Sequence, residues 1–157
     1  HFKANRSSGE SSKEYREINN QKSRDLTFLG DILQSRNFYK AALIEYRRAV
    51  DQSKIFSPIL HNKLAKAHLI TKEYNKAEVI LNKSLDLYPM FHSTLANLGE
   101  LYFDMGDIEK SRSFYERAVE INPFNPFPHM RLMTIYQKLG WKKEKELQTK
   151  LFGYIDH

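Results

Sequence analysis

The chain has 157 residues, of which 41% are apolar and 28% charged, and it carries a formal net charge of +6. A chain of this size suits one domain that buries a little under ~70% of the surface its extended form would expose. Because cysteine is absent, a disulfide framework and a cysteine zinc site are excluded. The sequence also has no apolar run near the ~18 residues that a membrane span needs.

The net charge is distributed in blocks of opposite sign. Residues 92–125 carry a net charge of −3, whereas the flanking segments 58–91 and 126–157 carry +2 and +3. Nucleic-acid binders usually present one coherent basic stripe interleaved with aromatic residues. This alternation argues against nucleic-acid binding.

Residues 1–22 are rich in Ser, Asn, Lys and Glu and show little periodicity. They fit either a solvated linker or a short helix that leans on the segment from residue 23 onward, and Ser11 with Glu14 has the spacing of a capping box. His1 in place of an initiator methionine indicates an excised piece. A targeting segment or a further domain can therefore have preceded it.

From residue 23 onward the chain repeats itself at intervals of 34 or 35 residues. A leucine followed by a small or apolar residue recurs at Leu29-Gly30, Leu64-Ala65, Leu98-Gly99 and Leu132-Met133. Apolar residues around each pair follow helical spacing in two blocks, which are separated by QSRN, ITKE, DMGD or QKLG. The pattern predicts four helical hairpins over 23–57, 58–91, 92–125 and 126–157.

We call these leucine-containing pairs the anchor pairs. The small residue of each is expected where the first helix of a hairpin approaches the second closely. Pro89 and Pro123 are expected to end second helices, and Pro58 and Pro126 to begin the next first helices. Ser57 and Asn125 are candidate N-caps for those helices. The first repeat has Lys54 at the position of these helix-ending prolines, which predicts a looser turn there.

The fourth unit departs from the pattern, because Met133 replaces the small residue and its second half is charged. A terminal repeat has no neighbour on one side, so a polar outer face is expected there. We therefore interpret 141–153 as a capping helix. Its inward side chains are expected to be Trp141, Leu147, Leu151 and Phe152.

The 34-residue spacing over residues 23–157 resembles the tetratricopeptide repeat family. The resemblance implies an all-α fold, a right-handed superhelix of tandem antiparallel hairpins known as an α-solenoid. The first helix of each repeat would line the concave wall of such a solenoid.

The sequence offers little for catalysis. His61 and His68 lie seven residues apart on one expected helix, about 10 Å, which is too far for one metal ion. These two and His129 occupy positions where other repeats carry core residues, so we interpret them as packing residues. No HExxH, phosphate-binding loop or G-x-S-x-G motif is present. We therefore expect a protein that is not an enzyme and has no cofactor or metal.

The candidate binding site is the set of first-helix side chains that the hairpin cores leave free. Phe103, Phe127 and Met130 are the most informative, because large apolar side chains facing solvent mark interaction sites. The full groove set is Asn62, Lys66, Leu69, Asn97, Glu100, Phe103, Phe127, Met130, Arg131 and Thr134.

Some members of the family hold a peptide's C-terminal carboxylate with lysine, asparagine and arginine from three first helices. Carried over by position, Asn97 and Arg131 fit, Asn62 and Lys66 have their residue types exchanged, and Phe127 replaces a lysine. The resemblance is therefore partial. Lys66, Asn97 and Arg131 still suit one anionic group, with Phe127 against an apolar neighbour.

We interpret the chain as a monomeric, non-catalytic interaction module that binds a peptide or partner helix in this groove, as adaptor or scaffold. One alternative is the non-catalytic tail of a larger enzyme such as a peptidase, and another is a self-associating structural protein. The sequence does not reveal the compartment, and the cytoplasm is only the default, since a targeting segment can lie outside these residues. On this interpretation Phe127→Ala with Arg131→Glu removes binding and leaves stability unchanged.

Overall fold

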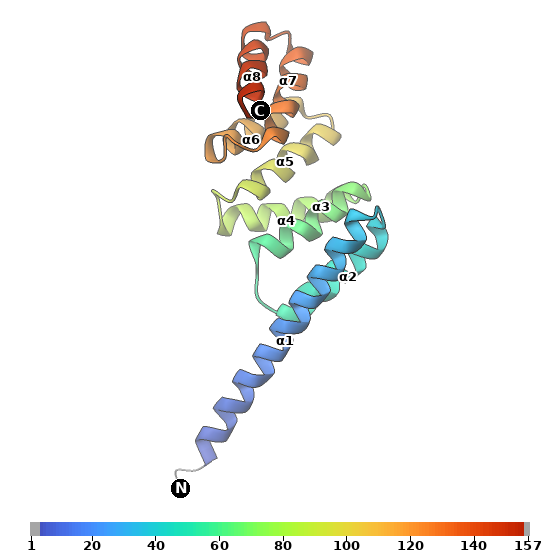
Figure 1. Cartoon of the computed structure of the whole chain (residues 1–157), viewed down its shortest axis with the longest axis vertical. Coiled ribbons are helices and arrows are strands. Elements are labelled where there is room, and N and C mark those ends of the chain that lie inside the picture. The colour runs from blue at the N-terminus through green and yellow to red at the C-terminus, as the bar shows by residue number, and fades with distance from the viewer. Residues whose placement is uncertain (1–3, 156–157) are drawn as a thin grey trace. The chain divides into compact units, whose positions relative to one another are not determined.

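The structure is a computed structural model that describes residues 4–155, and over that range the chain forms eight α-helices and no strand (Figure 1). They are α1 (Ala4–Ser35), α2 (Tyr39–Ser53), α3 (Pro58–Ile70), α4 (Tyr74–Leu87), α5 (His92–Asp104), α6 (Ile108–Ile121), α7 (Pro126–Leu139) and α8 (Lys142–Ile155). The predicted all-α class is confirmed, and a turn separates the two helices of each repeat.

The chain divides into two compact units, His1–Lys72 and Glu73–His157. In the first unit, α1 packs on α2 and α2 packs on α3. In the second unit, each helix from α4 to α7 packs on the helix that follows it. Each unit therefore has its own sequence of neighbouring helices.

The turns within the four repeats share one backbone feature. Seven residues after each small-residue position, the backbone takes a positive φ, at Asn37, Lys72, Gly106 and Gly140. Asparagine and glycine tolerate this left-handed conformation better than other residues. The turn type is thus repeated even though its residue is not.

Capping explains where several helices begin. The Ser57 side chain accepts a hydrogen bond from the Leu60 backbone N–H, and Asn125 accepts one from Phe127, with a proline at the first turn of each helix. Both predicted N-caps are confirmed. Asp107, which was not predicted as a cap, begins α6 by accepting from the Lys110 N–H. The αL conformation of Lys54 ends α2 without a proline.

Helix α1 differs from the expected linker and repeat. It runs for 32 residues without a break, so it passes through Ser11 and does not begin there. Its N-terminal half extends beyond α2 (Figure 1). The segment contains no proline, so a helix nucleated by packing on α2 can propagate toward the N-terminus. Residues 1–3 lie outside the described range.

Both anchor glycines lie beneath a tyrosine ring of the next helix. A Cβ atom at Gly30 would lie 2.6 Å from Tyr46, and one at Gly99 would lie 2.9 Å from Tyr115. Both tyrosines are buried. Ser111 also donates a 2.7 Å hydrogen bond to the Gly99 carbonyl, which confirms the expected close approach of α5 and α6. The glycines are required because the rings occupy the space of a side chain.

The C-terminal helix α8 is oriented differently from the prediction. Leu147 is 56% exposed, so its inward assignment is wrong, and Leu151 is only partly covered. Trp141 does pack inward, because its ring stacks on Tyr136 with centres 5.9 Å apart, and Phe152 is half-buried. Gln148 is buried in place of Leu147, with its amide oxygen 2.6 Å from Nδ1 of His129 on α7. The Nε2 atom of His129 lies 2.7 Å from the Pro123 carbonyl oxygen. A buried imidazole needs partners for both nitrogens, which explains why a polar residue faces inward.

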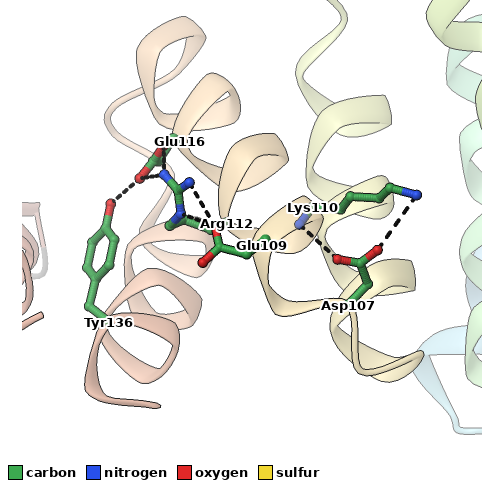
Figure 2. Close-up of polar contacts among 6 residues, drawn as sticks. All are labelled: Asp107, Glu109, Lys110, Arg112, Glu116 and Tyr136. Carbon is green, nitrogen blue, oxygen red and sulfur yellow. Dashed lines mark hydrogen bonds and ion pairs between the residues drawn. The ribbon is translucent and has the colours of Figure 1, made fainter. Parts of the chain in front are cut away.

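Helix α6 carries three glutamates and three basic residues, and ion pairs within the helix join several of these charges (Figure 2). Arg112 donates to both oxygens of Glu116 and to Glu109, and Tyr136 of α7 donates to Glu116 at 2.7 Å. Burial and the hydrogen bond to Glu116 raise the pKa of Tyr136. The network fastens α7 to α6 and pairs two of the three glutamates of α6.

Candidate ligand-binding surfaces

The first unit contains an open pocket of about 390 Å³ between α1, the start of α2 and α3. Its lining residues are Asp31, Gln34, Ser35, Tyr39, Lys66 and Ile70. Most of these come from the first helices of two successive repeats, and they mix charge, amide, hydroxyl, aromatic and aliphatic groups. The pocket therefore has the chemistry of a site for a polar side chain with an apolar neighbour.

Asp31 is already engaged on the wall of this pocket. Tyr46 donates to its Oδ1 at 2.7 Å, and Lys63 of α3 forms an ion pair with its Oδ2. Burial, followed by the hydrogen bond to Asp31, raises the pKa of Tyr46. Lys63 thus compensates the carboxylate, and the tyrosine fixes its position.

Lys66 is the lining cation that remains available. It is exposed, and the described residues provide no ion pair for it. Beside it, the Oε1 atom of Gln34 is buried without a hydrogen-bond partner among the described residues. The pocket therefore offers one free positive charge and one unsatisfied acceptor.

The second unit contains a corresponding carboxylate in a different setting. Tyr115 donates to Glu100 at 2.5 Å, and Arg131 donates to both carboxylate oxygens at 2.6 and 3.0 Å. Burial is the main cause of the raised pKa of Tyr115, and the hydrogen bond to Glu100 adds to it. Such a bidentate pair is the strong form of a carboxylate contact.

Arg131 also lies over two aromatic rings. Its guanidinium carbon is 4.8 Å from the Phe103 ring centre and 5.4 Å from that of Phe127. These distances are those of cation–π contacts. Phe127 and Met130 are 42% and 49% exposed, which leaves an apolar strip beside an arginine that already has its partners.

The other predicted groove residues have different environments. Asn62 and Leu69 are buried, and Asn62 donates to the Pro58 carbonyl at 2.8 Å. Asn97 is half-buried and Thr134 is exposed. Asn62 therefore serves its own helix, and exposed Lys66 is the member of the set that borders the pocket.

The three histidines are packing residues, as predicted. His68 and His129 are buried, and the ring of His61 stacks on Phe56 with centres 3.9 Å apart. Within residues 4–155, no cluster of three His, Cys, Asp or Glu side chains has the arrangement of a metal site. None of the helices in that range is long and apolar enough to cross a membrane.

Sequence reasoning missed the part of the pocket that α1 and α2 contribute, namely Gln34, Ser35 and Tyr39. A signal existed, because Gln34 occupies the repeat position of Leu69 and Phe103. The predicted groove set came from the last three repeats alone. Extending the same alignment to the first repeat would have found this residue.

Known proteins share both the repeats and the fold. The tetratricopeptide repeat family model matches residues 59–89 and 92–125. The tetratricopeptide repeat protein TTC0263 of Thermus thermophilus superposes with a TM-score of 0.76 at 22% identity, covering 85% of this chain and 74% of that one. The first such domain of Spaghetti (RPAP3), solved bound to the HSP90 peptide SRMEEVD, gives 0.68 at 25% identity, covering 77% and 95%.

A curated relative is the BBSome complex member BBS4 of Bos taurus, which is 30% identical over 102 residues. The match covers 65% of this chain and 19% of that protein, so the chain spans about a fifth of its length. The hairpins and their surfaces define a helical repeat protein of the interaction-module class. Residues 59–89 and 92–125 are tetratricopeptide repeats, and the whole described chain has the fold of tetratricopeptide repeat proteins.

Proposed function

We propose that the chain is a non-catalytic adaptor or scaffold module that binds an extended peptide or partner helix through first-helix side chains. In the first unit, Lys66 holds an acidic side chain or terminal carboxylate, and Ile70 and Tyr39 contact its apolar neighbour. In the second unit, Phe127 and Met130 form an apolar contact surface beside Glu100, Phe103, Arg131 and Thr134.

The observation that carries this proposal is the contrast between the two cations. Arg131 is held by Glu100 and by two rings, so an anionic ligand would have to displace an existing bidentate pair. Lys66 lies at an open pocket without an ion pair from the described residues. A ligand carboxylate gains most where the cation has no competing partner.

The likeness to the RPAP3 domain supports an acidic ligand. That protein is solved with the peptide SRMEEVD, in which acidic residues flank a valine near the C-terminus. A peptide of this kind combines charge with an apolar side chain, as the Lys66 pocket requires. It is therefore a suitable first probe for this chain.

The test is fluorescence anisotropy of labelled SRMEEVD with the whole chain, compared with SRMQQVN as a probe without acidic side chains. We expect saturable binding of the acidic probe and weaker binding of the neutral one. Lys66→Glu should abolish binding because it replaces the free cation with a repelling charge. Arg47→Glu is the matched control, because it makes the same change of charge at an exposed position of α2. This variant should bind the acidic probe normally.

Equal losses from Lys66→Glu and Arg47→Glu would show that only net charge matters and would refute the pocket. Binding that survives Lys66→Glu but is lost with Met130→Ala would place the ligand on the second unit instead. Circular dichroism of each variant checks that the helices are retained.

A further inference from the structure

One face of α1 is left uncovered where the later repeats are covered. Leu29 is 42% exposed, whereas Leu64, Leu98 and Leu132, at the same repeat position, are 6%, 0% and 0% exposed. In the later repeats the first helix packs against the preceding second helix, through the pairs α2 with α3, α4 with α5 and α6 with α7. Among residues 4–155, no helix precedes α1 to do the same.

The residues just before the repeat cannot supply that cover. A preceding hairpin would turn near residue 20, which lies 34 residues before Lys54, the end of α2. Instead, α1 runs unbroken through this point. The described N-terminal segment therefore extends along the axis of α1 and does not fold back over Leu29.

The uncovered face is a stripe with heptad spacing. Its members Ile18, Lys22, Asp25 and Leu29 follow one another at steps of four and three residues, and Ile32, one step further, is half-buried. Ile18 is 54% exposed, and Lys22 and Asp25 are exposed between the apolar members. Alternating steps of four and three place side chains along one seam of a helix. Residues that face α2, such as Ser23 and Gly30, lie on a different side and are buried.

The stripe is complementary to itself when reversed. If two copies lie antiparallel with Lys22 opposite Asp25 of the partner subunit, Ile18 falls opposite Leu29 of the partner subunit. A two-fold axis repeats both contacts, because Ile18 and Leu29 are equidistant from the midpoint between Lys22 and Asp25. We propose that the chain forms a symmetric dimer through antiparallel packing of this stripe, henceforth the α1 stripe.

Charge identifies a second copy as the occupant. Asp25 occupies the repeat position of Leu60, Thr94 and Pro128, all of which are buried. An ordinary apolar helix laid on the α1 stripe would cover Asp25 without a compensating cation, which is costly. A second copy supplies Lys22 at that point. Asp25 itself accepts only a hydrogen bond from Gln21 at 2.8 Å and makes no ion pair within the described chain.

The charged pair also determines the orientation. Parallel packing would place Lys22 opposite Lys22 and Asp25 opposite Asp25, and both contacts are repulsive. The apolar pairs supply buried area, while the Lys22–Asp25 ion pairs contribute mainly to register and specificity. The dimer differs from the monomer predicted from the sequence.

Sedimentation velocity of the whole chain over a concentration series tests the dimer. The natural chain should show a monomer–dimer equilibrium. Lys22→Glu alone and Asp25→Lys alone should each be monomeric, because each substitution opposes like charges across the two-fold axis. An equimolar mixture of the two variants should dimerise again, because every like-charge contact then becomes an opposite-charge contact.

A second pair of variants tests the apolar contact. Leu29→Glu should lose the dimer over the concentration range in which the natural chain dimerises. Ile44→Glu, at a half-exposed apolar position on α2, should retain it. A natural chain that stays monomeric at all concentrations, or a variant mixture that fails to dimerise, overturns the proposal. A dimer that survives Leu29→Glu also overturns it, because another surface would be responsible.

Discussion

Each unit contains a set of four interacting residues at equivalent repeat positions, and the two sets have different surroundings. The set consists of a glycine, the acidic residue after it, a tyrosine of the next helix and a cation of the helix after that: Gly30, Asp31, Tyr46 and Lys63 in the first unit, and Gly99, Glu100, Tyr115 and Arg131 in the second. In the second unit the cation also stacks on Phe103 and Phe127. In the first unit the carboxylate borders an open pocket.

The second repeat shows what happens when this set is absent. It carries Ala65, Lys66 and Leu81 at the positions of the glycine, the acid and the tyrosine. Leucine has no hydroxyl group, so no carboxylate is needed to accept a hydrogen bond from it. A lysine can therefore stand at the acidic position. The choice between tyrosine and leucine at this buried position of the second helix thus decides whether a cation on the first helix is free for a ligand.

The largest effect should come from filling the space beneath Tyr115. Gly99→Leu should prevent the second unit from forming a stable fold, at a cost of roughly 3 kcal/mol or more, because the buried ring cannot move away. Gly99→Ala should also destabilise, since the clash outweighs the ~1 kcal/mol helix-propensity gain of alanine. Urea unfolding followed by fluorescence of Trp141, the single tryptophan, measures this.

The control for the glycine substitution is the pair of residue types that the second repeat carries at these two positions, alanine and leucine. Gly99→Ala together with Tyr115→Leu should destabilise less than the sum of the two single changes. Strict additivity would mean that the ring is not what requires glycine. Gly30→Ala should show the same coupling to Tyr46→Leu, because the first unit has the same close approach.

An intermediate effect is expected from reversing the cation. Arg131→Glu should cost about 2 kcal/mol, because it opposes Glu100 and removes the contacts to two rings. Lys63→Glu should cost less, since its ion pair is more exposed and no ring contact to it is observed in residues 4–155. Urea midpoints of both variants measure the difference, with Arg131→Met separating loss of the pair from repulsion.

The Arg131 result also bears on the sequence-based prediction that Phe127→Ala with Arg131→Glu leaves stability unchanged. The ion pair and the ring contacts now predict a destabilised second unit. An unchanged midpoint for Arg131→Glu would show that the pair contributes nothing in solution.

The smallest effect concerns the buried phenols. Burial, together with the hydrogen bond to Asp31 or Glu100, raises the pKa of Tyr46 and of Tyr115. The folded chain therefore retains protons above pH ~10, where unfolded tyrosines release them. The contribution of these phenols to stability is present below that pH and is lost as the pH rises above it.

Absorbance of phenolate during an alkaline titration checks this expectation. The buried tyrosines should ionise together with unfolding and not before it. Tyr115→Phe should remove one late-titrating group and cost about 1–2 kcal/mol at neutral pH. A phenol that titrates near pH ~10 in the intact fold would contradict the burial argument.

Particular residues show how far the sequence could predict the structure. The repeat spacing located the hairpins, their turns, the caps at Ser57 and Asn125, and the buried histidines. The repeat spacing predicted the wrong orientation for Leu147. The side chain of α8 that faces inward is Gln148, because buried His129 on α7 requires a hydrogen-bond partner. The repeat spacing also did not anticipate that Glu100 pairs with Arg131, 31 residues away. Groove membership was predicted by position, but availability to a ligand depends on such pairings.

The sequence alone determined the number, type and spacing of the hairpins, because local periodicity, turn residues and caps act within a few residues of each other. It did not predict that α1 is one unbroken helix, on which the α1 stripe lies. Only the tertiary structure decided which first-helix side chains are free, since that depends on partners brought together from different helices. Lys66 and Arg131 illustrate the distinction: both are cations on first helices, yet one borders an open pocket and the other is already paired.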